Sequence, residues 1–161
     1  MNKGLIAKAS ISINTPVDIV WDALTNPELI RQYMFGTNVI SDWKEGSPII
    51  WKGEWEGNKY EDKGVILKLE PGLLIQYSHF STLSGQQDLP ENYHTVTIEL
   101  SGKGKQTFVS LLQDNNATEE AREHSEKNWK IMLDEEAFGE IIYDRCYQKT
   151  FCGIRESIQC T

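Results

Sequence analysis

The feature that most constrains the fold is the segment from Ile11 to Phe35, where an alternating strand leads directly into two short helices. Apolar and polar residues alternate over residues 5–13, which predicts a strand with one buried and one solvated face. Pro16 and Pro27 suit the first turns of two helices, because the N–H that proline lacks would be unpaired there. The sequence therefore predicts the order strand, helix, helix at the start of the domain.

The segment from Thr37 to Asp114 has the pattern of antiparallel strands joined by short turns. Turns are indicated at residues 44–46, 56–58, 70–72 and 101–104, and about six strands lie between them. The apolar faces of these strands are predicted to carry Ile49, Trp51, Gly53 and Trp55; Val65, Leu67 and Leu69; Leu73, Ile75 and Tyr77; and Val96, Ile98 and Leu100. A twisted sheet of this size curls around its apolar face.

A long helix beginning near Thr118 is predicted to cover that face. Its first turn is acidic, and its apolar stripe contains Ala121, Ser125, Trp129, Met132 and Leu133. A helix against a curved antiparallel sheet is an α+β arrangement.

Several short pieces of the chain resemble one known family. They are residues 16–25 (PVDIVWDALT), residues 26–29 (NPEL), the Glu45-Gly46 turn and residues 125–133. These pieces resemble the SRPBCC superfamily, also called START-like or Bet v 1-like, and within it the branch named for the activator of heat-shock protein 90 ATPase. The resemblance implies a helix-grip fold, with six or seven antiparallel strands around a long C-terminal helix and two short helices closing one end.

The chain is predicted to be one domain over residues 1–133, followed by an atypical extension over residues 134–161. The extension loses the helical stripe and contains all three cysteines, Cys146, Cys152 and Cys160, at spacings that match no zinc or redox pattern. Two hypotheses remain open. The extension is either lineage-specific or the product of a shifted reading frame, or the last helix continues to about Tyr143 and ends in a loose tail.

Charge and hydropathy exclude several classes of partner. A formal net charge of -8 and a pI near 4.9 argue against nucleic acid and anionic membranes, which are bound by clustered Lys and Arg. The sequence has no signal-peptide pattern and no apolar run long enough to span a bilayer. We therefore expect a cytoplasmic protein without stable membrane insertion.

Aromatic and weakly polar residues on the predicted inner faces are typical of a ligand cavity. The candidate ligand-binding residues are Phe35, Trp51, Trp55, Tyr77, His79, Trp129 and Met132. The predicted function is a non-enzymatic binding domain that holds an apolar or amphipathic, lipid-like or polyketide-like molecule between the sheet and the C-terminal helix. The competing interpretation is that these side chains only fill the core.

Two other functions follow from the resemblance. One is a chaperone partner, whose ATPase the protein would activate by docking. The other is a cavity enzyme, similar to cyclases or hydrolases of aromatic substrates, with Tyr77, His79 and His94 as the residues to suspect. His79 and His94 flank a loop and could meet across paired strands, but they do not complete a metal ligand set. No nucleophile elbow or phosphate-binding loop is present, so we expect no catalytic residue, metal or cofactor.

Overall fold

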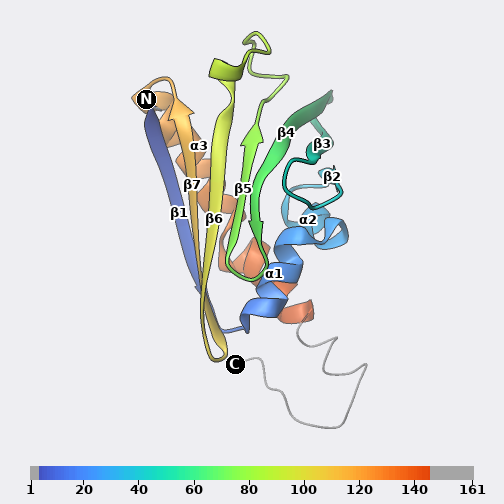
Figure 1. Cartoon of the computed structure of the whole chain (residues 1–161), viewed down its shortest axis with the longest axis vertical. Coiled ribbons are helices and arrows are strands. Elements are labelled where there is room, and N and C mark those ends of the chain that lie inside the picture. Colours follow the sequence, from blue (N-terminus) through green and yellow to red (C-terminus); the bar gives the residue numbers. More distant parts are fainter. Residues whose placement is uncertain (1–3, 146–161) are drawn as a thin grey trace.

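The computed structural model describes residues 4–145, which form a seven-stranded antiparallel sheet with helices on one side (Figure 1). The strand order is β1-β7-β6-β5-β4-β3-β2. The strands are β1 (Leu5–Ile13), β2 (Asn38–Ser41), β3 (Pro48–Trp55), β4 (Asn58–Glu70), β5 (Leu74–His79), β6 (His94–Lys103) and β7 (Gln106–Asn116). The helices are α1 (Val17–Thr25), α2 (Pro27–Tyr33), the 3-10 turn η1 (Pro90–Asn92), α3 (Glu119–Met132) and the π-helical turn η2 (Glu135–Gly139). This is the predicted α+β helix-grip fold.

Helices α2 and α3 begin where the local sequence predicts, whereas Pro16, predicted in the first turn of α1, is its N-cap residue. Asn26 caps α2, because its side chain accepts a hydrogen bond from the Glu28 N–H at 3.1 Å, and Pro27 follows in the first turn. Thr118 caps α3 by accepting from the Ala121 N–H at 3.1 Å. Since β1 and β2 lie at opposite edges of the sheet, the chain that joins them through α1 and α2 crosses one end of the sheet. These two helices therefore close that end.

The inner face of β4 differs from the predicted one. Val65 and Leu67 are exposed, and the inward residues are Ile66, which is fully buried, and Leu69, which is partly buried against the core. A register shift in the pairing with β5 lies between Ile66 and Lys68. Such a bulge inserts one residue, so the side chains before it change faces while those after it keep the expected side. The prediction of Val65 and Leu67 as core residues was therefore wrong.

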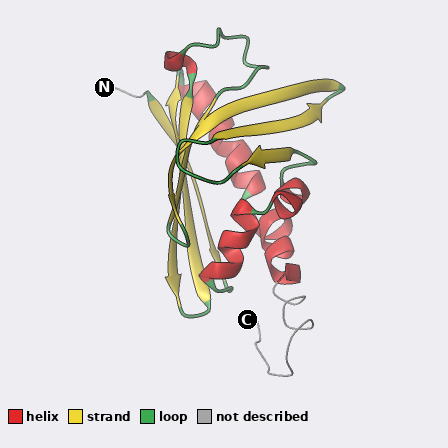
Figure 2. Ribbon diagram, turned by 45° about the vertical axis from the view of Figure 1, so that its right-hand side comes forward, coloured by secondary structure: helices red, strands yellow, loops and turns green. Residues whose placement is uncertain are grey.

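Gly64 lies where β4 passes from its pairing with β3 to its pairing with β5. A Cβ atom at this position would collide with the carbonyl oxygen of Ser78, so only glycine allows the two strands to approach this closely. Figure 2 shows the hairpin of β3 and β4 turning away from the rest of the sheet. The bend lets this part of the sheet wrap around the helices.

The described part of the segment after Leu133 contributes to the core. After η2 the chain is helical again over residues 140–145, and Phe138 and Ile142 are fully buried. The Phe138 ring packs edge-on against Tyr33 of α2, with ring centroids 4.9 Å apart. We propose that the folded unit extends past Leu133 to at least Ile142. The three cysteines lie outside the described residues.

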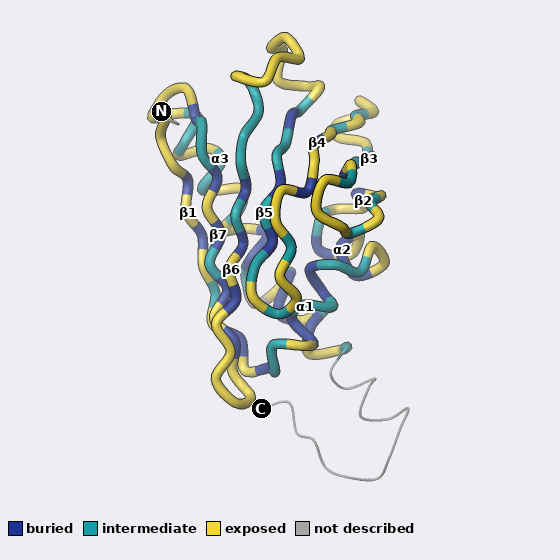
Figure 3. Tube along the Cα trace, in the orientation of Figure 1, coloured by how far each residue is buried: buried dark blue, intermediate teal, exposed yellow. Residues whose placement is uncertain are grey.

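Burial follows the layers of the fold. In Figure 3 the buried residues lie along the middle of the strands and on the facing sides of the helices, while the tips of the β3–β4 and β6–β7 hairpins are exposed. No helix within residues 4–145 is long and apolar enough to span a bilayer.

Candidate functional site

A cavity between the sheet and α3 consists of two adjoining compartments. Their common walls are Met34, Trp51, Tyr77 and Trp129. The inner compartment has a volume of about 40 Å³ and is lined in addition by Leu24, Ile30, Tyr33, Val39, Trp43, Ile49, Ile75, Ile98, Leu111, Met132 and Leu133. The outer compartment has a volume of about 130 Å³ and is lined in addition by Thr37, Tyr60, Asp62 and His79.

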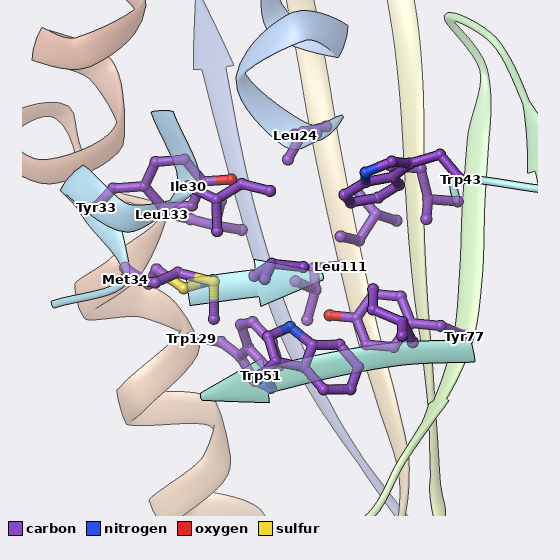
Figure 4. Close-up of a pocket in the computed structure, with 15 residues that line it drawn as sticks. Leu24, Ile30, Tyr33, Met34, Trp43, Trp51, Tyr77, Leu111, Trp129 and Leu133 are labelled. Atoms are coloured by element: carbon purple, nitrogen blue, oxygen red, sulfur yellow. The ribbon is translucent and has the colours of Figure 1, made fainter. Parts of the chain in front are cut away.

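The inner compartment is almost filled by its own side chains (Figure 4). By the same measure one water needs only about 10–15 Å³, so a space of this size holds a few waters but no guest as large as an aromatic ring. The Tyr33 hydroxyl donates to the Ala23 carbonyl at 2.8 Å, and burial, with a smaller contribution from Tyr77, raises the pKa of Tyr33 far above its ordinary value. For this part of the cavity the interpretation of a filled core is appropriate.

The outer compartment combines aromatic walls with a polar edge. The Trp51 ring lies beside the Tyr77 ring, with centroids 5.1 Å apart, and beside the His79 ring, with centroids 5.0 Å apart. Burial raises the pKa of Tyr77 far above its ordinary value, so its hydroxyl stays protonated and can donate a hydrogen bond.

The Trp129 side chain is held in this wall by a hydrogen bond to the sheet. Its indole N–H donates to the side-chain oxygen of Gln113 on β7 at 2.5 Å. Gln113 is held in turn by Ser125 and Asn116, at 3.3 and 3.4 Å. This buried polar network ties α3 to the sheet and sets the position of the Trp129 ring.

The polar edge is built by β4, β5 and the turn after α2. The side chains of Asp62 and His79 are paired at 3.0 Å (Oδ2 to Nε2), and the hydroxyls of Tyr60 and Thr37 are 2.6 Å apart. Tyr60 can lie across β3 because its partner there is Gly53, where a Cβ would collide with the Tyr60 ring.

The predicted approach of His79 and His94 is confirmed. They are direct partners in the pairing of β5 with β6, and their rings stack with centroids 6.4 Å apart. His94 does not line either compartment, because its Nδ1 bonds the Asp114 carbonyl oxygen at 2.8 Å. Residues 4–145 contain no group of His, Cys, Asp and Glu able to hold a metal ion. Chemically, the Asp62–His79 pair and the hydroxyls of Thr37 and Tyr60 offer hydrogen-bonding groups to a guest.

Five of the seven predicted ligand-binding residues line the cavity: Trp51, Tyr77, His79, Trp129 and Met132. The other two lie outside both compartments. Trp55 is 57% exposed at the tip of the β3–β4 hairpin, beyond the helices that cover the sheet. Phe35 is 67% exposed, because it has a left-handed backbone (φ 52°) in the turn after α2, where the Gly36 N–H bonds the Arg31 carbonyl at 2.9 Å.

Sequence reasoning missed Met34, Thr37, Tyr60 and Asp62 of the outer compartment. A signal for two of them exists: Tyr60 and Asp62 alternate with Gly64 and Ile66, the inward residues of β4. The predicted inner face on Val65 and Leu67 concealed that alternation.

Comparison with known proteins identifies the fold and the family. A solution structure of the protein ChR145 from Cytophaga hutchinsonii is 50% identical, with a TM-score of 0.74, over 95% of this chain and all of that one. The crystal structure of CalU16 from Micromonospora echinospora is 20% identical, with a TM-score of 0.63, over 89% of this chain and 87% of that one.

The solution structure of the Aha1 dimer from Colwellia psychrerythraea is 19% identical, with a TM-score of 0.62, over 83% of this chain and 93% of that one. The curated proteins yield no match. The profile of the family described as activator of Hsp90 ATPase homolog 1-like protein matches residues 14–136. The chain therefore belongs to the activator of Hsp90 ATPase homolog 1-like family, within the SRPBCC fold.

Proposed function

We propose that this chain is a non-enzymatic binding domain that holds one small apolar or amphipathic molecule in the outer compartment. The observation that carries the proposal is the outer compartment itself, a space of about 130 Å³ with aromatic walls and one polar edge. An engineered protein cavity of about 150 Å³ is known to bind benzene, so this space suits a guest with a single ring. Pockets for drug-sized ligands are about 300–1,000 Å³, so a sterol or a long fatty acid would require the walls to move.

Binding would be driven by burial of the apolar part of the guest. Removal of apolar surface from water contributes about 25 cal/mol per Å². The rings of Trp51 and Trp129 offer flat contact surfaces, and Met34 can adapt its shape to the guest. The polar edge at Asp62 and His79 would orient the guest.

Protein-detected NMR titration with toluene, a medium-chain fatty acid and a flavonoid tests this proposal. We expect toluene to shift the signals around Trp51, Tyr77 and Trp129, with smaller or slower effects from the larger molecules. Trp55 is a matched internal control, since it lies on the same strand as Trp51 but outside the cavity. Unchanged spectra with all three probes would contradict the proposal.

A second candidate function is a protein-interaction role with a chaperone of the Hsp90 type. It is favoured by the family match and by apolar side chains exposed on the outer face of the sheet, namely Ile6, Phe108 and Leu112. If this function holds, the chain raises the ATPase rate of an Hsp90 protein, and Phe108→Ser reduces the effect while Phe35→Ser does not. No rise at saturating concentration would remove this candidate.

A further inference from the structure

Six Tyr and Trp side chains lie in the cavity walls. Three of them, Tyr33, Tyr60 and Trp129, form a hydrogen bond through their polar atom, whereas Trp43, Trp51 and Tyr77 form none among residues 4–145. Tyr33 and Trp129 are paired, with the Ala23 carbonyl and the Gln113 side chain respectively. The Tyr77 hydroxyl and the Trp51 indole N–H are not, although these residues are only 8% and 5% exposed. Buried donors are nearly always paired in native proteins, so two unpaired donors side by side need an explanation.

Both donors open onto the cavity. Among the described residues, the one side-chain polar atom that is sealed from solvent without a partner is Thr15 Oγ1, so the donors of Trp51 and Tyr77 still touch free space. Figure 4, which draws the residues that line the inner compartment, shows the Tyr77 oxygen and the Trp51 nitrogen on the same side of their two rings, whose centroids are 5.1 Å apart. Both residues are walls that the inner and the outer compartment share, so we place the two donors at the boundary between the compartments. Water can satisfy them in the empty protein, and the guest would replace that water.

The negative charge near the two donors limits which acceptor group the guest can carry. Two N–H or O–H donors require an acceptor, and an oxygen atom with two lone pairs can accept both bonds. A carboxylate would fit this geometry but would be buried near the Asp62 carboxyl group, in a chain of formal net charge -8. Burial of an anion without a cationic partner is strongly unfavourable.

We propose that the guest is a neutral single-ring aromatic carbonyl compound, whose oxygen accepts hydrogen bonds from Tyr77 and Trp51. The class includes aromatic aldehydes, ketones and amides. The ring lies against Trp51 and Trp129 in the outer compartment. This inference rests on the proposed binding function and adds the chemical class of the ligand and the two residues that select it.

Three probes of nearly equal shape test the inference: acetophenone, α-methylstyrene and benzoate. In α-methylstyrene a CH₂ group replaces the carbonyl oxygen, so a cavity without donors would prefer this more apolar molecule. We expect acetophenone to bind about 10-fold more tightly than α-methylstyrene, and benzoate to bind most weakly. Dissociation constants from NMR titration of the full chain provide the comparison.

Tyr77→Phe keeps the ring and removes the donor, so it is expected to reduce the affinity for acetophenone several-fold and to leave that for α-methylstyrene unchanged. Trp51→Phe removes the donor together with part of the wall, so it is expected to weaken the binding of both probes, and that of acetophenone more. Trp55→Phe is the control and should change neither. A melting experiment without ligand adds a second test: Tyr77→Phe should not lower the melting temperature, because no intramolecular hydrogen bond is lost, whereas Tyr33→Phe should.

The outcomes separate this inference from the proposed function. Tighter binding of α-methylstyrene or benzoate would overturn the carbonyl assignment while the binding function stands. Loss of stability in Tyr77→Phe equal to that in Tyr33→Phe would also overturn it, since Tyr77 would then have a partner in the chain. Absence of binding by all three probes and by toluene would overturn both.

Discussion

The two compartments share four wall residues but differ in how they end. The inner compartment is closed by α1, α2 and the C-terminal end of α3, and its volume is only about 40 Å³. The outer compartment ends at polar side chains and has a volume of about 130 Å³. The inner compartment resembles an ordinary core, in which close packing provides stability. The outer compartment contains free space, and two of its wall residues, Trp51 and Tyr77, have donors without a hydrogen-bond partner among residues 4–145. Stability and binding are therefore expected to separate along one cavity.

The largest expected effect comes from shortening the chain after Leu133. Such a chain loses Phe138 and Ile142, both fully buried, and exposes Tyr33. Removal of a buried Phe side chain alone costs about 3–5 kcal/mol, so we expect the shortened chain to be largely unfolded or to have lost at least that much unfolding free energy. Denaturant titration measures the difference.

The matched control ends at Arg145 and keeps both buried residues. It should retain nearly all of the stability of the full chain. If the chain ending at Leu133 were as stable as the chain ending at Arg145, the domain boundary predicted at Leu133 would be correct, and the inner compartment would not depend on the later segment.

Tyr33→Phe is expected to have a smaller effect, confined to stability. The Ala23 carbonyl would lose its hydrogen bond from Tyr33, and an unmade buried bond costs about 1–3 kcal/mol. Because this bond belongs to the inner end, ligand affinity in the outer compartment should stay the same. A fall in affinity similar to the fall in stability would break the separation of the two ends.

Asp62→Asn tests the outer compartment, where we expect a change in ligand binding and almost none in stability. The change removes the carboxylate but keeps an oxygen able to pair with His79 Nε2. We expect benzoate affinity to rise several-fold, because an anionic guest no longer faces a like charge, while unfolding free energy changes little. Thermal unfolding and NMR titration together check this, and unchanged benzoate binding would show that Asp62 does not affect the guest.

The smallest effect is expected at Asp88, in the loop between β5 and β6. A hydrogen bond from Lys63, and a second one from Tyr93 at 2.6 Å, hold the pKa of Asp88 below its ordinary value. The resulting stabilisation is present above the ordinary pKa of an aspartate and is lost as the pH falls through the lowered pKa. Because Asp88 is exposed, solvent screens the effect, and Asp88→Asn should lower the melting temperature only slightly.

Melting curves of wild type and Asp88→Asn over a series of acidic pH values measure this effect. The two curves should converge as the pH falls. A difference that stays constant with pH would indicate that the carboxylate of Asp88 is not the cause.

The sequence was sufficient for those parts of the fold that depend on local patterns. The alternation in β1, β5 and β6 and the caps of α2 and α3 follow from neighbouring residues, and the structure confirms the antiparallel sheet and its covering helix. The exchange of faces in β4 could not be predicted, because the bulge after Ile66 arises from pairing with β5.

The late core residues were hidden for a related reason. Leu133 and Phe138 are five positions apart, across a π-helical turn, whereas an α-helical stripe requires three or four. The site was predicted in part, because Trp51, Tyr77 and His79 alternate along regular strands. The exposed positions of Phe35 and Trp55 depend on a left-handed turn and on the reach of the helices, which alternation does not encode.

The close approach at Gly64 has a consequence for the engineering of this protein. Libraries intended to change ligand preference would vary the walls of the outer compartment, but any codon other than glycine at position 64 would force β4 away from Ser78. The curvature that shapes the cavity thus depends on a residue that lines neither compartment. Deep mutational scanning should find position 64 as intolerant as the fully buried Ile66 beside it, even though it carries no side chain.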